Sequence, residues 1–482
     1  MSVKFINNIS SMKINGSYIK QGKINGHVVF EMTGKVNINI TYSDTDFTII
    51  SDKTGVYDLC FANTDSVLDD YESIQQFSLT ANVPQTYSHL NNLNVAPTNA
   101  TRIVAVDKSG NIVSQMNIPS TMKLNLGNKL YSVGVLSDIH LDGNGDGNNE
   151  DSGSSQADFI NAIQFFNRNT VDLICIDGDV TYYGYIEDYE AYKSIVNTYS
   201  NGTPIMAVRG NHECYVDGGD FYEDYDYTNT RFQEYINELY YEYIHSKGDV
   251  YLFCGMYKES KSTPFSDEEM TWLANKLEEH KNRRVFLFVH YYYSQVGNVN
   301  NISSHGQITN ETFINLLKTY KNIVYFSGHT HLAFYLQQYG DTANIAEKGD
   351  LCSIVHVPSC AKPRVSDDGE EESYYTYYEG SEGYLMDVYE DGILLKGVNF
   401  ETNKYKPIAT YYLDTTIPTI TDEEINAVKN MNATLDGDLS ITYDDSVLDI
   451  EFGIENNDLI VDNNVTGLDF NINNDGELEA DY

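Results

Sequence analysis

The middle of the chain alternates short apolar runs with longer segments of helical periodicity. Five apolar runs recur between residues 129 and 400, and they read YSVGVLSDIH, VDLICIDGD, PIMAVRGNHE, RRVFLFVHYYY and NIVYFSGHTH. Runs of this length predict buried strands, and the segments between them, such as 155–168 and 266–281, predict helices. Ser266 and Glu269 fit a capping box at the start of the second helix. This alternation is typical of an α/β architecture.

The first 32 residues follow a different pattern and contain an internal repeat. KINGSYIKQG is followed at once by KINGHVVFEM, and each copy holds an Asn-Gly pair, Asn15-Gly16 and Asn25-Gly26. Asn-Gly between alternating residues is the strongest short-range hairpin signal. We therefore predict an N-terminal β-hairpin element over residues 1–32.

The remaining boundaries follow from further changes in pattern. Residues 33–124 alternate apolar and polar positions, as in KVNINITY and TRIVAVD, which predicts a small β-sandwich. Residues 125–415 hold the α/β region. In the acidic segment 416–482, leucines recur at about ten-residue spacing, as in DLSITYDD and DLIVDNN. Short β-strands with Asn and Asp turns fit this repeat better than the competing interpretation, which is a disordered acidic tail.

Composition adds a strongly acidic balance. The 482 residues include 30 Lys and Arg against 71 Asp and Glu, for a net charge of −41. Such a surface repels polyanions, so we expect no nucleic-acid partner. The length predicts two to four domains, and the hydrophobic content of 41% permits sizeable cores. Six cysteines show no CxxC spacing, and Cys175 lies in an apolar run, so reduced thiols are expected.

No segment predicts export or membrane insertion. The N-terminal residues MSVKFINNIS lack a basic stretch followed by an apolar run, so no secretory signal is expected. No apolar run approaches the length of a membrane span, so no membrane span is expected either.

Each of the five predicted strands ends in residue types that bind metals. In chain order, the ends carry Asp138-x-His140, Gly178-Asp179, Gly210-Asn211-His212-Glu213, His290 and Gly328-His329-Thr330-His331. Any one of these is weak, because Asp-x-His arises by chance, Gly-Asp is usually a turn, and a single histidine more often packs in a core. Ligand sites gather at the carboxyl ends of strands in open α/β sheets, so the complete set predicts one metal site.

The spacing within the motifs is consistent with shared ligands. Residues i and i+2 of an extended strand face the same side, so Asp138 and His140 can reach one metal, and so can His329 and His331. Glycines before three of the motif residues permit tight turns and close backbone approach. A mixture of carboxylate, imidazole and amide ligands favours Mn, Fe or Zn over an all-oxygen Mg or Ca site.

The set resembles the signature of the calcineurin-like metallophosphoesterase superfamily: D-x-H, G-D, G-N-H-[ED], H and G-H-x-H. Every signature position is filled, over about residues 129–400. The resemblance implies an α/β fold in which a two-sheet β-sandwich is flanked by helices, with two metal ions at the carboxyl edge. With the flanking segments, we expect an N-terminal all-β domain before this fold and a C-terminal β-repeat tail after it.

The resemblance also implies a role for each motif residue. The first metal would be held by Asp138, His140, Asp179 and His331. The second would be held by Asp179, Asn211, His290 and His329. Asp179 suits a bridging position because a carboxylate can bind two metals, whereas an imidazole normally cannot. His212 is then free for proton transfer, as leaving-group acid or transition-state stabiliser, so Asp179 and His212 are the expected catalytic residues. Glu213 would brace the ligands.

Two weaker signals lie near the motifs. Residues 142–151, DGNGDGNNED, match the start of an EF-hand-like Ca²⁺ loop, but the twelfth position is Gly153 rather than Glu, so a plain acidic loop is favoured. Tyr291 and Tyr292 follow His290 directly and could stack on a substrate, which Asn211 and His212 would also contact. The alternative is that these tyrosines pack on the surface or in the core.

Together these features predict a dimetal hydrolase of phosphate esters. The repeated KING segment resembles the N-terminal segments of phage tail and baseplate proteins. We therefore expect an enzyme that is part of the virion and binds other tail proteins. A homo-oligomer is one arrangement that this role would allow. Its substrate would be a cell-surface phosphodiester polymer such as teichoic acid. One alternative is a secreted or surface-bound phosphatase or nucleotidase acting on small phosphate esters. Another is a structural or adhesive virion protein with a structural metal site, which the presence of His212 disfavours.

Overall fold

The described residues of the computed structural model are 13–14, 17–18, 21–24, 27–31, 38–42, 46–63, 66–88, 96–118, 126–143, 155–216, 220–221, 225–293, 307–334, 345–346, 351–365, 376–377, 380–415, 450–455, 458–463, 469–472 and 478–481. The chain forms two compact units, residues 1–428 and residues 429–482. The candidate metal ligands all lie in the first unit.

Two short hairpins open the first unit. Strand β1 (Lys13–Ile14) pairs antiparallel with β2 (Ser17–Tyr18), and β3 (Gln21–Ile24) pairs antiparallel with β4 (His27–Glu31). The Asn-Gly pairs that predicted the turns lie between these strands and outside the described residues.

The described elements between residues 38 and 117 are all strands, arranged in two antiparallel sheets. Their bounds are β5 (Ile38–Tyr42), β6 (Asp46–Ser51), β7 (Gly55–Ala62), β8 (Gln75–Leu79), β9 (Gln85–Ser88), β10 (Arg102–Asp107) and β11 (Ile112–Asn117). One sheet has the order β5-β6-β9 and the other β11-β10-β7-β8. Ile49, Leu59, Phe61 and Ile103 belong to one buried apolar cluster shared by both sheets.

The first sheet of the α/β region has six strands in the order β14-β13-β12-β25-β26-β27. Their bounds are β12 (Lys129–Leu136), β13 (Leu173–Ile176), β14 (Ile205–Ala207), β25 (Glu382–Tyr389), β26 (Gly392–Asn399) and β27 (Lys404–Asp414). The three predicted strands pair in parallel, and β12 pairs antiparallel with β25, which is more than 240 residues later in the chain.

The second sheet also has six strands, in the order β17-β18-β19-β20-β22-β21. Their bounds are β17 (Tyr240–Ile244), β18 (Val250–Cys254), β19 (Val285–Phe288), β20 (Ile323–Ser327), β21 (Ile345–Ala346) and β22 (Ser353–His356). The central strands are parallel, and the two edge strands run antiparallel to their neighbours. Strand β22 adds a further parallel carboxyl end next to β20.

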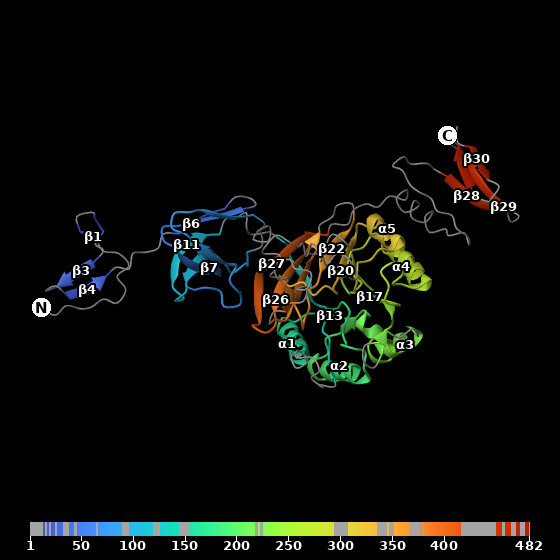
Figure 1. The fold of residues 1–482 in the computed structure, drawn as a ribbon, viewed down its shortest axis with the longest axis horizontal. Helices are drawn as coiled ribbons and strands as arrows, with labels where there is room; N and C mark the ends of the chain where they lie inside the picture. The colour runs from blue at the N-terminus through green and yellow to red at the C-terminus, as the bar shows by residue number, and fades with distance from the viewer. Residues whose placement is uncertain are drawn as a thin grey trace. The chain divides into compact units, whose positions relative to one another are not determined.

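The two sheets pack against each other through a shared core. Val133 and Met386 from the first sheet and Phe288 and Phe326 from the second lie in one fully buried cluster. The continuous apolar sequences of these strands are explained by burial of both sheet faces. Mixed sheets with helices outside agree with the predicted α/β architecture (Figure 1).

Helices cover the outer face of each sheet. Their bounds are α1 (Ser155–Arg168), α2 (Ile186–Tyr199), α3 (Tyr225–Tyr235), α4 (Asp267–Glu279) and α5 (Glu311–Thr319). Residues of α1 and α2 pack on the first sheet, and residues of α4 and α5 pack on the second (Figure 1). The predicted capping box is present, because Ser266 Oγ accepts from Glu269 N and Glu269 Oε2 accepts from Ser266 N.

Short elements complete both units. In the first unit they are the 3-10 turn η3 (His212–Cys214) and the strands β15 (Tyr215–Val216), β16 (Asp220–Phe221), β23 (Arg364–Val365) and β24 (Thr376–Tyr377). In the second unit, β28 (Ile450–Glu455) pairs with β29 (Asp458–Asn463), and β30 (Asp469–Ile472) pairs with β31 (Leu478–Asp481). Both pairs are antiparallel.

Among the helices of the described residues, none combines the length and the apolar character that crossing a membrane requires.

Candidate metal centre

The motif residues follow the strand ends as the sequence predicted. Asp138 and His140 come after β12, Asp179 after β13, and Asn211 and His212 after β14. In the second sheet, His290 comes after β19, and His329 and His331 come after β20. Parallel strands deliver their carboxyl ends to one edge, so both sheets contribute to the same site.

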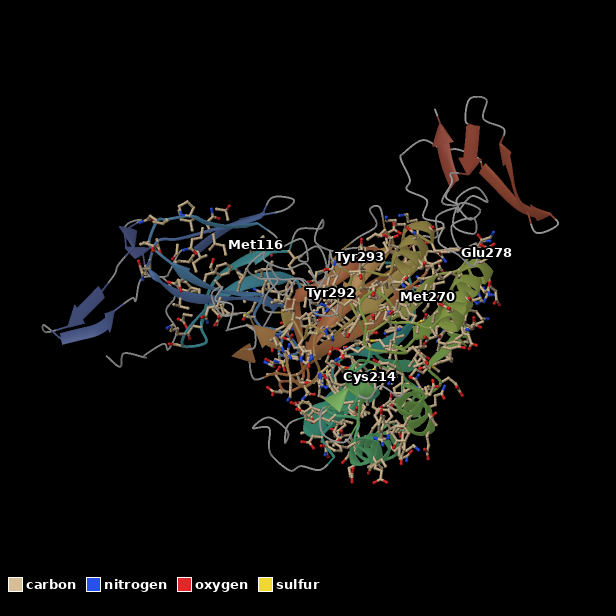
Figure 2. All side chains as sticks on the ribbon, turned by 45° about the vertical axis from the view of Figure 1, so that its right-hand side comes forward. Met116, Cys214, Met270, Glu278, Tyr292 and Tyr293 are labelled. Carbon is tan, nitrogen blue, oxygen red and sulfur yellow. The ribbon has the colours of Figure 1, made fainter. Side chains whose placement is uncertain are left out.

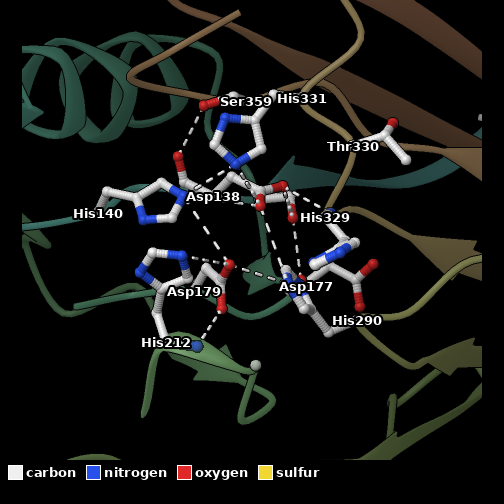
Figure 3. Close-up of polar contacts among 12 residues, drawn as sticks. Asp138, His140, Asp177, Asp179, His212, His290, His329, Thr330, His331 and Ser359 are labelled. Atoms are coloured by element: carbon white, nitrogen blue, oxygen red, sulfur yellow. Dashed lines mark hydrogen bonds and ion pairs between the residues drawn. The ribbon is translucent and has the colours of Figure 1, made fainter. Parts of the chain in front are cut away.

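The ligand atoms gather into two adjoining groups of buried residues. The first group is Asp138, His140, Asp179 and His331. The second group is Asp179, His290 and His329. Within each group, one atom from every residue lies within 4.8 Å of the others, and Asp179 belongs to both groups (Figure 3). The structure thus brings together the carboxylates and imidazoles that the sequence singled out.

The backbone at these residues differs from the extended geometry expected. Asp138, His140, Asp179, His329 and His331 all have positive φ, between 49° and 69°. This left-handed conformation costs roughly 1 kcal/mol or more for a residue with a Cβ, and such strain clusters at functional sites. Asp138 with His140, and His329 with His331, therefore reach the site from left-handed turns that follow the strands and not from extended strands. His329 and His331 consequently join different groups, whereas the spacing alone had allowed them to share one metal.

Distances in the first group are those of atoms facing a common point. His331 Nε2 lies 3.1 Å from Asp138 Oδ1 and 2.9 Å from His140 Nε2. His140 Nε2 lies 3.8 Å from Asp179 Oδ2. The Nδ1 of His331 donates to the carbonyl oxygen of Lys362 at 3.1 Å, which leaves Nε2 as the nitrogen with a lone pair toward the group.

The second group has the same construction. His290 Nε2 lies 3.0 Å from Asp179 Oδ2, and His290 Nδ1 donates to the carbonyl oxygen of Asp177 at 2.6 Å. Asn211 lies in sequence between Gly210 and His212, which both approach Asp179 of this group. The backbone N–H of His212 donates to Asp179 Oδ1 at 2.9 Å. A Cβ added to Gly210 would come within 2.2 Å of the same oxygen, so only glycine permits this approach.

The residues fit two metal ions by a test that does not depend on resemblance. Asn211 Oδ1 is buried and has no hydrogen-bond partner among the described residues. Buried polar atoms without partners are costly, and cation coordination would satisfy them. Carboxylate, imidazole and amide donors together suit Mn, Fe or Zn.

Charge in the metal-free site follows from burial and mutual proximity. Burial opposes ionisation of Asp138, but His331 and His290 outweigh it and hold the pKa of this carboxyl well below its usual range. Burial and the neighbouring His212 hold the pKa of His140 well below its usual value. Burial also opposes protonation of His290, but Asp179 and Asp138 outweigh it and raise the pKa of His290 to about 10. A proton on His290 therefore occupies the second group at neutral pH.

Metal binding is expected to release that proton, because His290 must lose it before Nε2 can bind an ion. Between about pH 7 and 9, the affinity for the second ion should rise about tenfold per pH unit, and the dependence should end as pH passes about 10. Calorimetric titration of chelated protein with Mn²⁺, in buffers of different ionisation enthalpy, measures the released protons. Equal heats in all buffers would contradict this assignment of the proton.

His212 lies at the open edge of the site. Its side chain is 22% exposed, whereas those of the neighbouring ligands His140 and Asp179 are each 1% exposed. The Nδ1 of His212 donates to the carbonyl oxygen of Tyr182 at 2.5 Å, and Nε2 lies 3.9 Å from Asp179 Oδ2. The Nε2 atom therefore faces the ligand groups from the solvent side.

Glu213 and Arg209 hold the segment around His212 from behind. Glu213 Oε1 accepts from Thr181 N at 2.7 Å, and Glu213 Oε2 accepts from Gly210 N at 2.8 Å. The contacts of Glu213 therefore match the bracing role expected of it. Arg209 is fully buried and donates to the carbonyl oxygens of Met256 and Glu213. The sequence did not predict that Arg209, which directly precedes Gly210, would hold this segment in place.

Tyr291 and Tyr292 differ from the expectation that they contact substrate. Their exposed fractions are 2% and 0%, and Tyr291 belongs to the core beneath α4 and α5. Tyr292, which Figure 2 labels, lies in the α/β region. The Tyr291 ring lies 4.7 Å from that of His329, and both tyrosines are buried, which agrees with the alternative interpretation that they pack in the core. The partly exposed tyrosines at the site edge are Tyr182, Tyr183 and Tyr215.

Several residues that support the metal ligands were not predicted from the sequence. Ser137 Oγ donates to Asp138 Oδ2 at 2.6 Å, and Ser359 Oγ donates to the Asp138 carbonyl oxygen at 2.8 Å (Figure 3). Ser359 and Lys362 follow β22, whose apolar run SIVH carried a usable strand signal. Most of the possible Ca²⁺ loop, residues 144–151, lies outside the described residues.

Comparison with known proteins gives one family match and one curated relative. Residues 131–333 match the family described as calcineurin-like phosphoesterase. A protein of Arcobacter nitrofigilis named probable glycerophosphodiester phosphodiesterase is 24% identical over 163 residues, which are 33% of this chain and 56% of that protein. The match thus spans just over half the length of the curated relative.

Two solved structures are also similar. A dimetal phosphatase from Danio rerio is 12% identical with a TM-score of 0.41, and the match covers 60% of this chain and all of that one. A purple acid phosphatase from yellow lupin, Lupinus luteus, is 11% identical with a TM-score of 0.43, and the match covers 81% of this chain and 77% of that one.

The family match and the geometry coincide. The matched residues 131–333 contain both groups of buried ligand atoms together with His212. The prediction of a calcineurin-like phosphoesterase domain is confirmed for residues 131–333, which match that family.

Proposed function

We propose that the chain hydrolyses phosphodiesters with two metal ions. The observation that carries the proposal is the pair of adjoining ligand groups that share Asp179, with His212 Nε2 facing them from the open side. Asp138, His140, Asp179 and His331 would hold one ion. Asp179, Asn211, His290 and His329 would hold the other.

Two ions held in these groups would supply Lewis acidity toward a phosphoryl oxygen and would activate water as a nucleophile at neutral pH. The protein residues then have three tasks. Burial of the ligands excludes bulk water, which strengthens the electrostatic interactions inside the site. The carbonyl oxygens of Asp177 and Lys362 orient His290 and His331 through their Nδ1 atoms. His212 offers a proton on Nε2 to the leaving oxygen, with its ring held by Tyr182.

A diester substrate is favoured over a monoester by the curated relative, whose name describes a probable glycerophosphodiester phosphodiesterase. The finer proposal is that the domain is carried on a phage tail and acts on a cell-surface polymer such as teichoic acid. It is supported by the repeated KING segment at residues 13–32 and by the regular leucine spacing of the C-terminal segment. With a net charge of −41, the protein surface repels such a polyanionic polymer, so only the metal site would attract it.

The proposal predicts turnover of bis-p-nitrophenyl phosphate in the presence of Mn²⁺, with slower or no turnover of p-nitrophenyl phosphate. Release of p-nitrophenol by protein first stripped with chelator and then reloaded measures both rates. Turnover of the monoester alone would replace the diesterase with a phosphatase. No turnover of either, from folded and metal-loaded protein, would overturn the proposed function. A teichoic acid as third substrate tests the finer proposal, which fails if only the small diester is cleaved.

A further inference from the structure

We propose that three tyrosines beside His212 form a leaving-group subsite that selects phosphodiesters whose leaving alcohol carries an aryl or pyranose ring. The tyrosines are Tyr182, Tyr183 and Tyr215, here called the tyrosine rim. The inference deepens the proposed function and rests on it, because the subsite has meaning only if a phosphate ester is cleaved next to His212.

The tyrosine rim lies beside the partly exposed His212 imidazole. The His212 ring centroid lies 5.2 Å from that of Tyr215, 5.9 Å from that of Tyr182 and 6.5 Å from that of Tyr183. Within the rim, the rings of Tyr182 and Tyr183 are 4.2 Å apart and those of Tyr183 and Tyr215 are 6.0 Å apart. All three side chains are only partly buried, unlike the fully packed Tyr292.

The backbone that carries the rim is tied down. The carboxylate of Asp188, which is buried, accepts from the backbone N–H groups of Tyr183 and Tyr185, each at 3.3 Å. Gly184 adopts φ +66°, and a Cβ there would come within 2.4 Å of the Tyr215 carbonyl oxygen. The 182–185 turn therefore lies directly against the Tyr215 backbone. A surface fixed in this way is preorganised for a ligand.

The rim is also connected to the ligand groups. The Lys362 ammonium lies 4.4 Å from the centroid of the Tyr182 ring, and the Lys362 carbonyl oxygen accepts from His331 Nδ1. The Tyr182 carbonyl oxygen accepts from His212 Nδ1. Tyr182 thus contacts both Lys362, next to the first ligand group, and His212 at the open edge.

Position and chemistry identify the occupant. His212 Nε2 faces the ligand groups, so an oxygen that takes its proton lies next to the His212 ring. The rim tyrosines are neighbours of the same ring, so the substituent on this oxygen would meet them. Neutral aromatic side chains favour broad apolar faces, such as the face of an aryl ring or the C–H face of a pyranose ring. Burial raises the pKa of Tyr215, so its phenol stays neutral at working pH. A linear glycerol substituent has no such face and gains little from the rim.

The test uses the full chain and three methyl phosphodiesters, which are phenyl methyl phosphate, glucose 6-(methyl phosphate) and glycerol 3-(methyl phosphate). The Tyr215→Leu and Tyr183→Leu variants are compared with the wild type by kcat/KM. The readout is kcat/KM for each ring-bearing substrate divided by kcat/KM for the glycerol substrate. General losses of activity cancel in this ratio, and intrinsic reactivity cancels when the ratio of a variant is compared with that of the wild type. We expect this ratio to fall about tenfold in Tyr215→Leu.

Two variants serve as controls. Tyr215→Phe keeps the ring. Tyr412→Leu removes a partly buried tyrosine from the first sheet, away from the strand ends that carry the metal ligands. Tyr412 pairs with Leu394, Leu394 pairs with Asp387, and Asp387 pairs with Ser132 in β12. Both should leave the ratio within about twofold of the wild type, because neither removes a rim ring. Thermal melting and turnover of the glycerol substrate show that each variant is folded.

The outcomes are separable. A fall in the phenyl ratio alone identifies an aryl leaving group, and a fall in the glucose ratio alone identifies a sugar. Unchanged ratios in both leucine variants would overturn the subsite while the proposed function stands on glycerol-ester turnover. If the wild type cleaves none of the three diesters, the proposed function fails and the subsite falls with it.

Discussion

Replacing Asp179 with asparagine is expected to lower kcat/KM for a phosphodiester by about 10³-fold or more. Asp179 is the residue common to both ligand groups, so its loss weakens both metal positions at once. Loss of several kcal/mol of charge stabilisation corresponds to a change of this size, since about 1.4 kcal/mol is tenfold in rate. The measurement is kcat/KM together with metal content by mass spectrometry, which should fall below two ions per chain.

The geometry explains why an amide cannot replace this carboxylate. Asp179 Oδ1 accepts from His212 N at 2.9 Å, so the amide oxygen of asparagine would take that position. The amide nitrogen would then occupy the Oδ2 position, 3.0 Å from His290 Nε2 and 3.8 Å from His140 Nε2. An NH₂ group there has no lone pair for a cation and places donors against the metal-binding nitrogens. The substitution keeps the shape of the side chain and removes its ligand function.

Asp177→Asn provides a matched control two residues earlier in the same segment. Asp177 is also fully buried, and its carboxyl oxygens have no hydrogen-bond partner among the described residues. Burial raises the pKa of Asp177 well above its usual value and so favours the neutral carboxyl. Asparagine has nearly the same shape and is also neutral, so activity should stay within about threefold of the wild type. An equal loss in both variants would show that general disruption of this segment, rather than metal ligation by Asp179, explains the result.

Much of the site could be predicted because its information is local. Each ligand sits within a few residues of an apolar run, so strand ends and motifs appear together in the sequence. Parallel pairing of β12, β13 and β14 then aligns those ends without further information. Helix α1 matches its predicted range, since its apolar spacing is also a local signal.

Non-local features could not be predicted in this way. The pairing of β12 with β25 and the support of Asp138 by Ser359 join segments more than 220 residues apart. Hydrophobic periodicity gives no register between such segments. The left-handed conformation of Asp138 and His140 was also hidden, because neither residue type signals positive φ in the way glycine does. Tyr291 and Tyr292 were assigned to the substrate because sequence adjacency to His290 does not reveal which side of the sheet edge a ring occupies.

Replacing His212 with alanine is expected to reduce kcat by about 10² to 10⁴-fold on a diester with an alkyl leaving group. His212 belongs to neither ligand group, so metal content should remain at two ions per chain. This pairing of lost turnover with retained metal separates His212→Ala from Asp179→Asn. Steady-state kinetics and metal analysis on the same samples make the comparison.

Dependence on the leaving group identifies what His212 does. A proton from Nε2 matters most when the departing oxygen is strongly basic, so the loss should be small for a p-nitrophenyl ester and large for an alkyl ester. Equal losses on both esters would instead assign His212 to stabilisation of the transition-state charge. The side chain is 22% exposed, so its removal leaves a space that opens to solvent. Added imidazole should therefore restore part of the activity toward the alkyl ester and leave turnover of the p-nitrophenyl ester nearly unchanged, because only the former requires the proton.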